Sequence, residues 1–371
     1  MRLFRLMPEI LNYQEPADFV AELSPCESDF VFISKSTYTQ YFDGLFGDAT
    51  VAFKSDYAKG EPTDSDLNHL IHDFMQRPYQ RIIAIGGGSV IDMAKSLTVT
   101  DGSDAVKLFQ KETEIVKRRE LIAVPTTCGA GSEVTNISIL SIAAMESKFG
   151  LVVDEIFPDK AVLIGKLIQN LPDHFFITSA IDGLIHSIES YLSAKSNVYT
   201  ELYSEKAILD YIRGFRRIAS EGIQVKADLS NDFLIASNMA GIAFSNTGTG
   251  AVHAISYPLS GKYHVTHGEA NALFLSAVLH LYEEKDNGTK LTLLKNILAQ
   301  ALDCDADTSL PALKDLLESI IALPALHTYG MQESEISLFA NSVVENQQRL
   351  LSNSYIHVET EDIEKIYQQL F

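Results

Sequence analysis

Residues 81–95, which read RIIAIGGGSVIDMAK, decide the fold. The segment opens with an apolar run of strand length, turns at Gly86, Gly87 and Gly88, and continues with helical spacing. Three glycines let the backbone approach a phosphate closely, and the free N–H groups at the start of a helix point toward it. The segment therefore predicts a strand, a phosphate-binding turn and a helix in an α/β fold.

Two details qualify this prediction. Ser89 and Asp92 have the spacing of a capping box, with Asp in place of the usual Glu. The pattern is neither Gly-x-Gly-x-x-Gly nor a Walker loop, so a tight turn without a ligand stays open as the alternative.

A second loop, residues 124–135, reads VPTTCGAGSEVT and follows another strand-like run. It is rich in glycine and small hydroxyl residues. Ligands of open α/β sheets bind at the carboxyl ends of the strands, so a second loop of this kind favours a ligand there. We interpret Cys128 as a packed thiol.

The first part of the chain alternates strand-like and helical patterns. Continuous apolar runs suit strands buried on both faces of a parallel sheet, with helices between them. Such runs lie at residues 29–34, 49–53, 81–85 and 121–124, a helix is predicted at 65–75, and residues 137–142 and 148–153 are expected to form an additional strand pair.

After residue 170 the strand-like runs give way to helical patterns. We predict an α/β dinucleotide-binding domain over residues 1–170, with a Rossmann-like parallel sheet, and an all-helical domain over residues 171–371. The predicted helices of the second domain are 178–192, 200–220, 231–244, 268–283, 289–302, 310–322, 334–350 and 361–370.

Composition restricts the possible partners and location. The formal net charge of −20 disfavours a nucleic-acid partner, because the phosphate backbone would be repelled. Three scattered cysteines fit a reducing cytoplasm. No run approaches the roughly 20 apolar residues of a membrane helix. Residues 1–8 make a poor signal peptide and are expected to form a first strand. We therefore expect a cytoplasmic protein with a small-molecule substrate and no membrane partner.

Four residues form a candidate metal site. Asp182 and His186 stand four residues apart in a predicted helix, so their side chains lie on one face. His253 and His267 flank residues 254–266, a segment with a glycine and a proline. One carboxylate and three imidazoles suit Fe²⁺ or Zn²⁺ and leave room for substrate. Spacing alone leaves other nearby ligands open, namely Glu189, His264 and Glu269.

The motifs together resemble one known family. Residues 86–95, 125–135, 182–191 and 267–271 are similar, in order, to motifs of the iron-containing (group III) alcohol dehydrogenases. PTTCG at 125–129, YHVTHGEAN at 263–271 and QQRLL at 347–351 resemble the 4-hydroxybutyrate dehydrogenase branch of that family. The resemblance implies a dehydroquinate synthase-like two-domain fold and a homodimer or larger homo-oligomer.

The resemblance also implies roles for individual residues. NAD would be the cofactor, although Lys35 after the second strand leaves NADP open. The metal, with Fe²⁺ favoured over Zn²⁺, would be bound by Asp182, His186, His253 and His267. The pyrophosphate and the rest of the cofactor would contact Gly86, Gly87, Gly88, Ser89, Asp92, Thr126, Thr127, Ser132 and Lys148.

The implied reaction is hydride transfer between the nicotinamide ring and the carbon of 4-hydroxybutyrate or succinate semialdehyde. The metal would act as a Lewis acid on the substrate oxygen, with His267 among its catalytic ligands. Many family members have a histidine where this chain has Tyr257, so the proton route is open between water, Tyr257 and His264. Arg349 and Lys262 are the candidate anchors for the substrate carboxylate.

Three other functions stay open from the sequence. The nearest is a dehydrogenase of the same family that acts on an uncharged primary alcohol or diol. A second is a sugar-phosphate cyclase resembling dehydroquinate synthase, although the basic cluster that a substrate phosphate needs is not visible. A third is a nucleotide-binding protein without catalysis, which the four metal-ligand residues argue against.

Overall fold

The computed structural model describes residues 3–142, 147–286 and 288–371. The chain divides into two compact units. One is Leu6–Asn170, here called the α/β unit. The other is Leu171–Phe371 together with Leu3–Arg5, here called the helical unit. The predicted combination of a parallel α/β domain with an all-helical domain is confirmed.

A six-stranded parallel sheet forms the centre of the α/β unit, in the order β1-β8-β5-β4-β2-β3. A separate antiparallel pair is formed by β6 and β7, as the sequence predicts. The strands are β1 Glu9–Asn12, β2 Asp29–Ile33, β3 Thr50–Phe53, β4 Arg81–Gly86, β5 Glu120–Pro125, β6 Ile137–Ile142, β7 Ser147–Val152 and β8 Lys160–Leu163.

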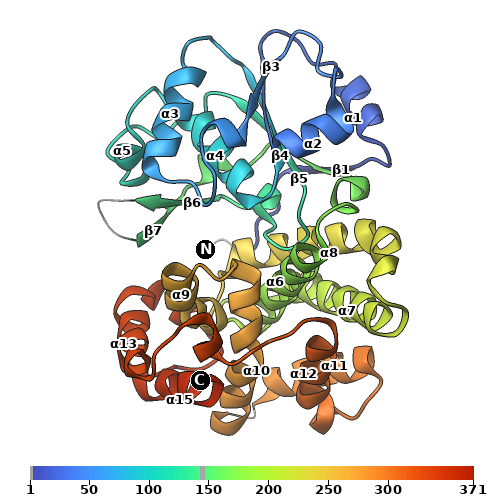
Figure 1. Cartoon of the computed structure of the whole chain (residues 1–371), viewed down its shortest axis with the longest axis vertical. Helices are drawn as coiled ribbons and strands as arrows, with labels where there is room; N and C mark the ends of the chain where they lie inside the picture. Colours follow the sequence, from blue (N-terminus) through green and yellow to red (C-terminus); the bar gives the residue numbers. More distant parts are fainter. Residues whose placement is uncertain (1–2, 143–146, 287) are drawn as a thin grey trace. The chain divides into compact units, whose positions relative to one another are not determined.

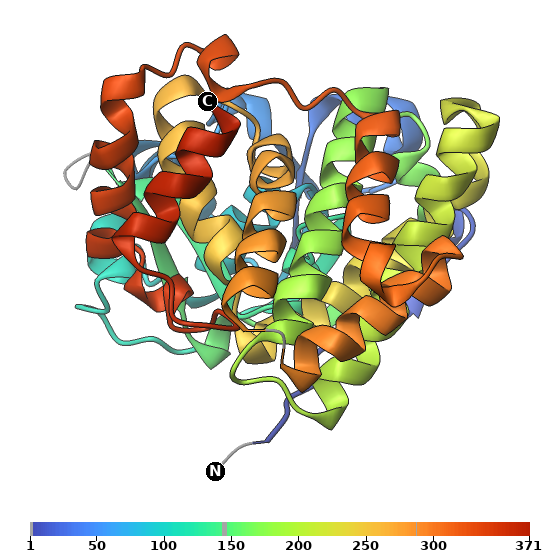
Figure 2. The ribbon, with the colours of Figure 1, turned by 90° about the horizontal axis from the view of Figure 1, so that it is seen from below.

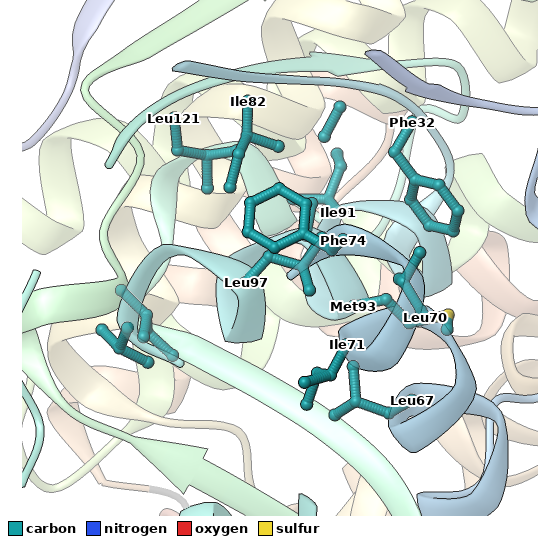
Figure 3. Packing of buried hydrophobic residues seen from close by; sticks show 14 of the residues in the cluster. Phe32, Leu67, Leu70, Ile71, Phe74, Ile82, Ile91, Met93, Leu97 and Leu121 are labelled. Carbon is teal, nitrogen blue, oxygen red and sulfur yellow. The ribbon is translucent and has the colours of Figure 1, made fainter. Parts of the chain in front are cut away.

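Helices cover both faces of this sheet (Figure 1). Alternate residues of β4 show why its sequence is apolar throughout. Ile82 and Ala84 pack into one buried cluster, and Ile83 and Ile85 pack into another. Figure 3 shows the first cluster, in which Phe74 and Leu97 pack near Ile82. The helices of this unit are α1 Pro16–Leu23, α2 Lys35–Thr37, α3 Asp64–Phe74, α4 Gly88–Val99 and α5 Ala105–Phe109.

The helical unit contains long helices joined by short turns (Figure 2). Helices α6 (green) and α10 (orange) lie side by side in it. The helices are α6 Asp173–Leu192, α7 Val198–Glu221, α8 Lys226–Thr247, α9 Ala251–Tyr263, α10 His267–Lys285, α11 Thr289–Leu302, α12 Ser309–Ile320, α13 Ile336–Asn346, α14 Gln348–Leu351 and α15 Thr360–Leu370.

The structure corrects the prediction for the amino end. The first strand is Glu9–Asn12, and Leu3–Met7 has no regular secondary structure. Phe4 stacks on Tyr199 with ring centroids 5.2 Å apart, and the Arg5 amide donates to Asn246 Oδ1 at 2.7 Å. The prediction was wrong because these partners come from the helical unit and are far away in sequence.

Two helix predictions also need correction. Residues 251–263 were not among the predicted helices, yet they form α9 with Pro258 inside it. Proline removes one backbone donor, and burial of Val252, Ile255 and Leu259 holds the helix together. The single helix predicted at 334–350 is divided into α13 and α14, because the backbone at Gln347 leaves helical geometry.

Candidate functional site

Helix α6 supplies the first two residues of the candidate metal site. Asp182 and His186 are one turn apart and only 5% exposed each. Helical periodicity puts both side chains on the same face, as the sequence predicts. The His186 ring stacks on Phe244 of α8 at 4.3 Å between centroids, which fixes its orientation.

Helix α9 brings His253 to this pair. His253 Nε2 lies 3.0 Å from His186 Nε2 and 3.6 Å from Asp182 Oδ1. One ligand atom from each of the three residues lies within 4.8 Å of the others. Three buried donors from two helices therefore converge on one point.

His267, the first residue of α10, stands at the rim of this group. Its Nε2 lies 3.8 Å from Asp182 Oδ1, and its side chain is 36% exposed. The tightly grouped donors are Asp182, His186 and His253, without His267. The rim position is the accessible side of the site.

Two residues that the sequence did not assign support these donors. Asn271 donates from Nδ2 to Asp182 Oδ1 at 2.7 Å, and its Oδ1 accepts from Ser256 at 2.5 Å. Glu189 Oε2 lies 2.6 Å from His253 Nδ1, on the side of the ring opposite to Asp182 and His186. Their spacing was visible: Glu189 follows His186 by three residues, and Asn271 follows His267 by four.

The other two ligands that spacing left open, Glu269 and His264, and the proton-route candidate Tyr257 have different surroundings. Glu269 accepts from Tyr329 at 2.8 Å and lies 3.2 Å from His174 Nε2. His264 ends α9 in the left-handed conformation and is exposed. Tyr257 lies one turn after His253 and is half-buried, with its ring centroid 6.1 Å from that of His267.

Charges at the site are strongly coupled. Burial acts to raise the pKa of Asp182, but His186, His267 and His253 together lower it well below its usual value. Burial acts to lower the pKa of His253, but Glu189 and Asp182 raise it to about 9. Two buried carboxylates therefore create a negative potential that favours a cation among these donors. A carboxylate oxygen and imidazole nitrogens are a donor set suited to Fe²⁺ or Zn²⁺.

In the α/β unit the two glycine-rich loops lie side by side. Gly86 pairs with Pro125 across the ends of β4 and β5, and Thr126 donates its amide to Gly86 O at 3.0 Å. A Cβ atom on Gly87 would lie 3.3 Å from Thr127 Cγ2. Helix α4 begins at Gly88, directly after the turn, so its first N–H groups lie at the carboxyl edge of the sheet.

A buried network joins α4, the helix that follows the glycine turn, to the second loop and to β6. Lys95 is fully buried and donates to Ser132 Oγ at 2.8 Å, Thr135 Oγ1 at 2.9 Å and Ile137 O at 2.7 Å. Asp92 accepts from Ser132 at 2.5 Å and from the Ile139 amide at 3.0 Å. Burial lowers the pKa of Lys95, and nearby Asp92 offsets part of this effect.

The network changes the interpretation of two residues. Asp92 does not complete a capping box with Ser89, because Gly87 precedes α4 without a side-chain cap and the Asp92 carboxylate accepts from Ser132 of the second loop and from the Ile139 amide of β6. The polar atoms of Asp92 and Ser132 bond each other, and their assignment to the cofactor stays a prediction. The same holds for Ser89, the second residue of α4, and for Thr126 and Thr127 on the second loop. The side chain of Lys148 lies outside the described residues.

The two candidate anchors for a substrate carboxylate differ in their surroundings. Lys262, near the end of α9, forms an ion pair with Glu335, whose pKa falls to about 2 mainly through hydrogen bonds from Lys262 and Tyr263. Arg349 is exposed on α14. Asn353 donates to both Arg349 O at 3.1 Å and Thr249 O at 3.0 Å, which holds the end of α14 beside the start of α9.

Comparison with known proteins identifies the family. Residues 20–164 match the model for iron-containing alcohol dehydrogenase, and residues 176–371 match the model for the C-terminal domain of the Fe-containing alcohol dehydrogenase family. The chain belongs to the iron-containing alcohol dehydrogenase family and is an oxidoreductase of that family. The resemblance seen in the sequence motifs is confirmed.

Individual relatives extend this result. The chain is 40% identical to a 4-hydroxybutyrate dehydrogenase from Clostridium kluyveri over 371 residues, which cover 100% of both chains. It is 32% identical to long-chain-alcohol dehydrogenase 1 from Geobacillus thermodenitrificans over 79% of this chain and 75% of that one.

Solved structures share the fold. A 1,3-propanediol oxidoreductase matches with a TM-score of 0.85 at 21% identity over 100% of both chains. A sulfoacetaldehyde reductase from Bifidobacterium kashiwanohense, solved in complex with NAD⁺, matches with a TM-score of 0.85 at 22% identity over 99% of this chain and 98% of that one.

Within the described residues, no helix has the length and apolar character needed to cross a membrane.

Proposed function

We propose that this protein interconverts 4-hydroxybutyrate and succinate semialdehyde in a metal-dependent, NAD-linked reaction. The observation that carries the choice of substrate is the 40% identity to a 4-hydroxybutyrate dehydrogenase over the full length of both chains. The observation that carries the chemistry is the convergence of Asp182, His186 and His253.

Asp182, His186 and His253 would hold the metal from the buried side, and His267 would complete the set from the rim. A divalent ion bound there would supply Lewis acidity toward the substrate oxygen. The 36% exposure of His267 indicates the side from which substrate reaches the donors. Fe²⁺ is our first choice and Zn²⁺ the second, since both accept imidazole and carboxylate ligands.

The glycine turn and the loop after β5 would bind the cofactor. Gly86, Gly87 and Gly88 allow close approach of a pyrophosphate, and the N-terminus of α4 favours its negative charge. We propose NAD as the cofactor, with NADP as the alternative because Lys35, two residues after the end of β2, is exposed. A homodimer or larger oligomer and a cytoplasmic location stay predictions.

Arg349 is the stronger candidate for holding the substrate carboxylate. Its guanidinium can bind a carboxylate through two parallel hydrogen bonds, and α14 lies beside the helix that carries His253. The amino group of Lys262 already pairs with Glu335. For the proton route, Tyr257 lies nearer the donors along α9 than the exposed His264 does.

The test is an assay of NADH oxidation by metal-depleted protein. Succinate semialdehyde and butanal would each be supplied with no metal, with Fe²⁺ or with Zn²⁺, and NADPH would replace NADH in parallel reactions. We expect metal-dependent turnover that favours succinate semialdehyde. Preference for butanal would instead indicate an alcohol dehydrogenase for uncharged substrates, and no turnover under any condition would exclude the dehydrogenase function.

A further inference from the structure

We propose that Glu189 is a positioning residue for the metal site, acting through His253. Its carboxylate would hold the imidazole with hydrogen on Nδ1, so that the lone pair of Nε2 faces Asp182 and His186. This inference rests on the proposed metal-dependent function, and it adds a residue that lies behind the ligands.

The first observation is the contact between the carboxylate and the ring. Glu189 Oε2 lies 2.6 Å from His253 Nδ1, and the two side chains are only 5% and 2% exposed. The other ring nitrogen, Nε2, lies 3.0 Å from His186 Nε2 and 3.6 Å from Asp182 Oδ1. The two nitrogens therefore face different partners, one for support and one for ligation.

The second observation is that the same carboxylate fixes the backbone that carries the ring. The amides of Gly250 and Val252 donate to Glu189 at 2.8 Å and 2.7 Å. These amides belong to the start of α9, immediately before His253, where helix N–H groups lack partners within the helix. Glu189 thus fixes both the position of the residue and the rotation of its side chain.

Glycine at position 250 makes this arrangement possible. A Cβ atom there would lie 3.3 Å from Glu189 Oε1, closer than an ordinary contact, and 3.4 Å from Ser354 Oγ. Because Gly250 has no side chain, the carboxylate can reach the helix start and the ring at once.

The chemistry of the carboxylate determines the tautomer. An ionised carboxylate can only accept hydrogen bonds, so a neutral imidazole in contact with it carries its hydrogen on the facing nitrogen. The opposite nitrogen then keeps a lone pair, which is the form that binds a metal ion. Ligand histidines are commonly oriented by a carboxylate in this way.

Replacing Glu189 by glutamine changes the group that faces His253 and keeps one of the two contacts to the start of α9. In Glu189→Gln, the amide oxygen can take the place of Oε1 and still accept from the Val252 N–H, while the amide nitrogen takes the place of Oε2 and the Gly250 N–H loses its acceptor. The amide nitrogen, however, can donate to His253 Nδ1, which favours hydrogen on Nε2 and blocks ligation. If Glu189 had only a capping role, this exchange would lower stability through the lost Gly250 contact and would leave the Co²⁺ spectrum of the site unchanged.

The matched control is Ser190→Ala. Ser190 is the next residue of α6, fully buried, and its hydroxyl accepts from Thr247 Oγ1 at 3.0 Å. This variant removes a buried hydrogen bond from the same turn without touching His253. Any effect of general loosening of α6 would appear in both variants.

The experiment measures Co²⁺ affinity of metal-depleted full-length protein by competition with a chelator, together with the visible absorption of bound Co²⁺. We expect Glu189→Gln to bind Co²⁺ about 10- to 100-fold more weakly than wild type, with an altered spectrum, and Ser190→Ala to match wild type. Wild-type affinity and spectrum in Glu189→Gln would overturn the inference. Equal weakening in Ser190→Ala would also overturn it.

Two further arms keep the test decisive. If Glu189→Gln does not fold, Glu189→Asp retains the charge but shortens the reach by one methylene, and we expect at least tenfold weaker binding, roughly the lower limit for such supporting groups. Unchanged affinity in Glu189→Asp would then overturn the inference. If wild type itself binds no Co²⁺, the metal assignment in the proposed function fails, and the inference fails with it. If Co²⁺ binds wild type and Ser190→Ala normally but binds the Glu189 variants more weakly, the result supports both the metal assignment and the role of Glu189.

Discussion

Gly268 of α10 lies directly against the backbone of Thr178 in α6. A Cβ atom on Gly268 would be 2.3 Å from Thr178 O and 3.4 Å from Asp182 Cβ. No side chain fits at that distance without moving one of the helices. The close approach of α6 and α10 is therefore what brings His267 to 3.8 Å from Asp182.

Gly268→Ala should push α10 away from α6 and disturb the metal site. We expect a loss of about 1–3 kcal/mol in the free energy of unfolding, the usual cost of overpacking, and weaker metal binding. Thermal unfolding and Co²⁺ titration would measure both effects. Gly261→Ala is the control, because Gly261 lies in α9 and a Cβ atom there would meet none of the described residues within 4 Å. That variant should be neutral or slightly stabilising, and equal losses in the two variants would contradict the explanation.

Lys95→Met should destabilise the α/β unit. The substitution removes three hydrogen bonds from the buried amino group and leaves Asp92 without the charge that lies 3.5 Å away. Breaking a buried pair in this way costs about 3–5 kcal/mol. Urea unfolding would measure the loss, and NADH binding should weaken because the network holds the second loop against α4, the helix that follows the glycine turn.

The control for Lys95→Met is Lys107→Met. Lys107 is exposed on α5 in the same unit. Its replacement should change the free energy of unfolding by no more than about 0.5 kcal/mol. Similar losses in both variants would show that burial of Lys95 is unimportant.

Glu335→Gln should remove a pH-dependent contribution to stability. Hydrogen bonds from Lys262 and Tyr263 lower the pKa of Glu335 from 4.5 to about 2. The folded state therefore favours the ionised form, and its stabilisation is complete above pH 4.5 and is lost as the pH falls toward 2. We expect the variant to have a Tm a few degrees below wild type at pH 7, with the difference shrinking through that acid range.

Thermal unfolding at several pH values would check this prediction. Glu333→Gln is the control, since Glu333 lies in the same turn and is exposed. It should match wild type at every pH. A Tm difference for Glu335→Gln that stays constant from pH 7 to pH 3 would argue against a contribution from ionisation.

Arg349→Met should impair use of the charged substrate selectively. Losing a two-point contact to a carboxylate should raise KM for succinate semialdehyde at least tenfold, equivalent to about 1.4 kcal/mol, with little change for butanal. Steady-state kinetics with both aldehydes would measure the change in KM for each of them. Lys262→Met should show no such selectivity, because Lys262 pairs with Glu335. If Lys262→Met loses the preference for succinate semialdehyde over butanal and Arg349→Met keeps it, Lys262 is the residue that holds the substrate carboxylate.

Much of the fold could be predicted because local patterns express it. The strands β2, β4 and β5 are buried on both faces, so their apolar runs mark them clearly. The first strand was predicted too early in the chain, because β1 is mostly exposed and has no continuous apolar run, and β8 was not predicted. Helix α9 was missed because Pro258 suggests a break, whereas burial of its apolar residues holds it together.

The residue types of the site and their spacing along the chain can be read from the amino-acid order. The four-residue spacing of Asp182 and His186 places them on one helix face, and helix geometry alone guarantees this. Which residues from distant parts of the chain contact these side chains is visible only in the folded structure. Glu189 stands behind His253 rather than among the ligands, and Lys262 is paired with Glu335, 73 residues away. Helix periodicity is a local property of the backbone, but contacts between helices depend on how their buried faces pack, and no spacing along the chain records that.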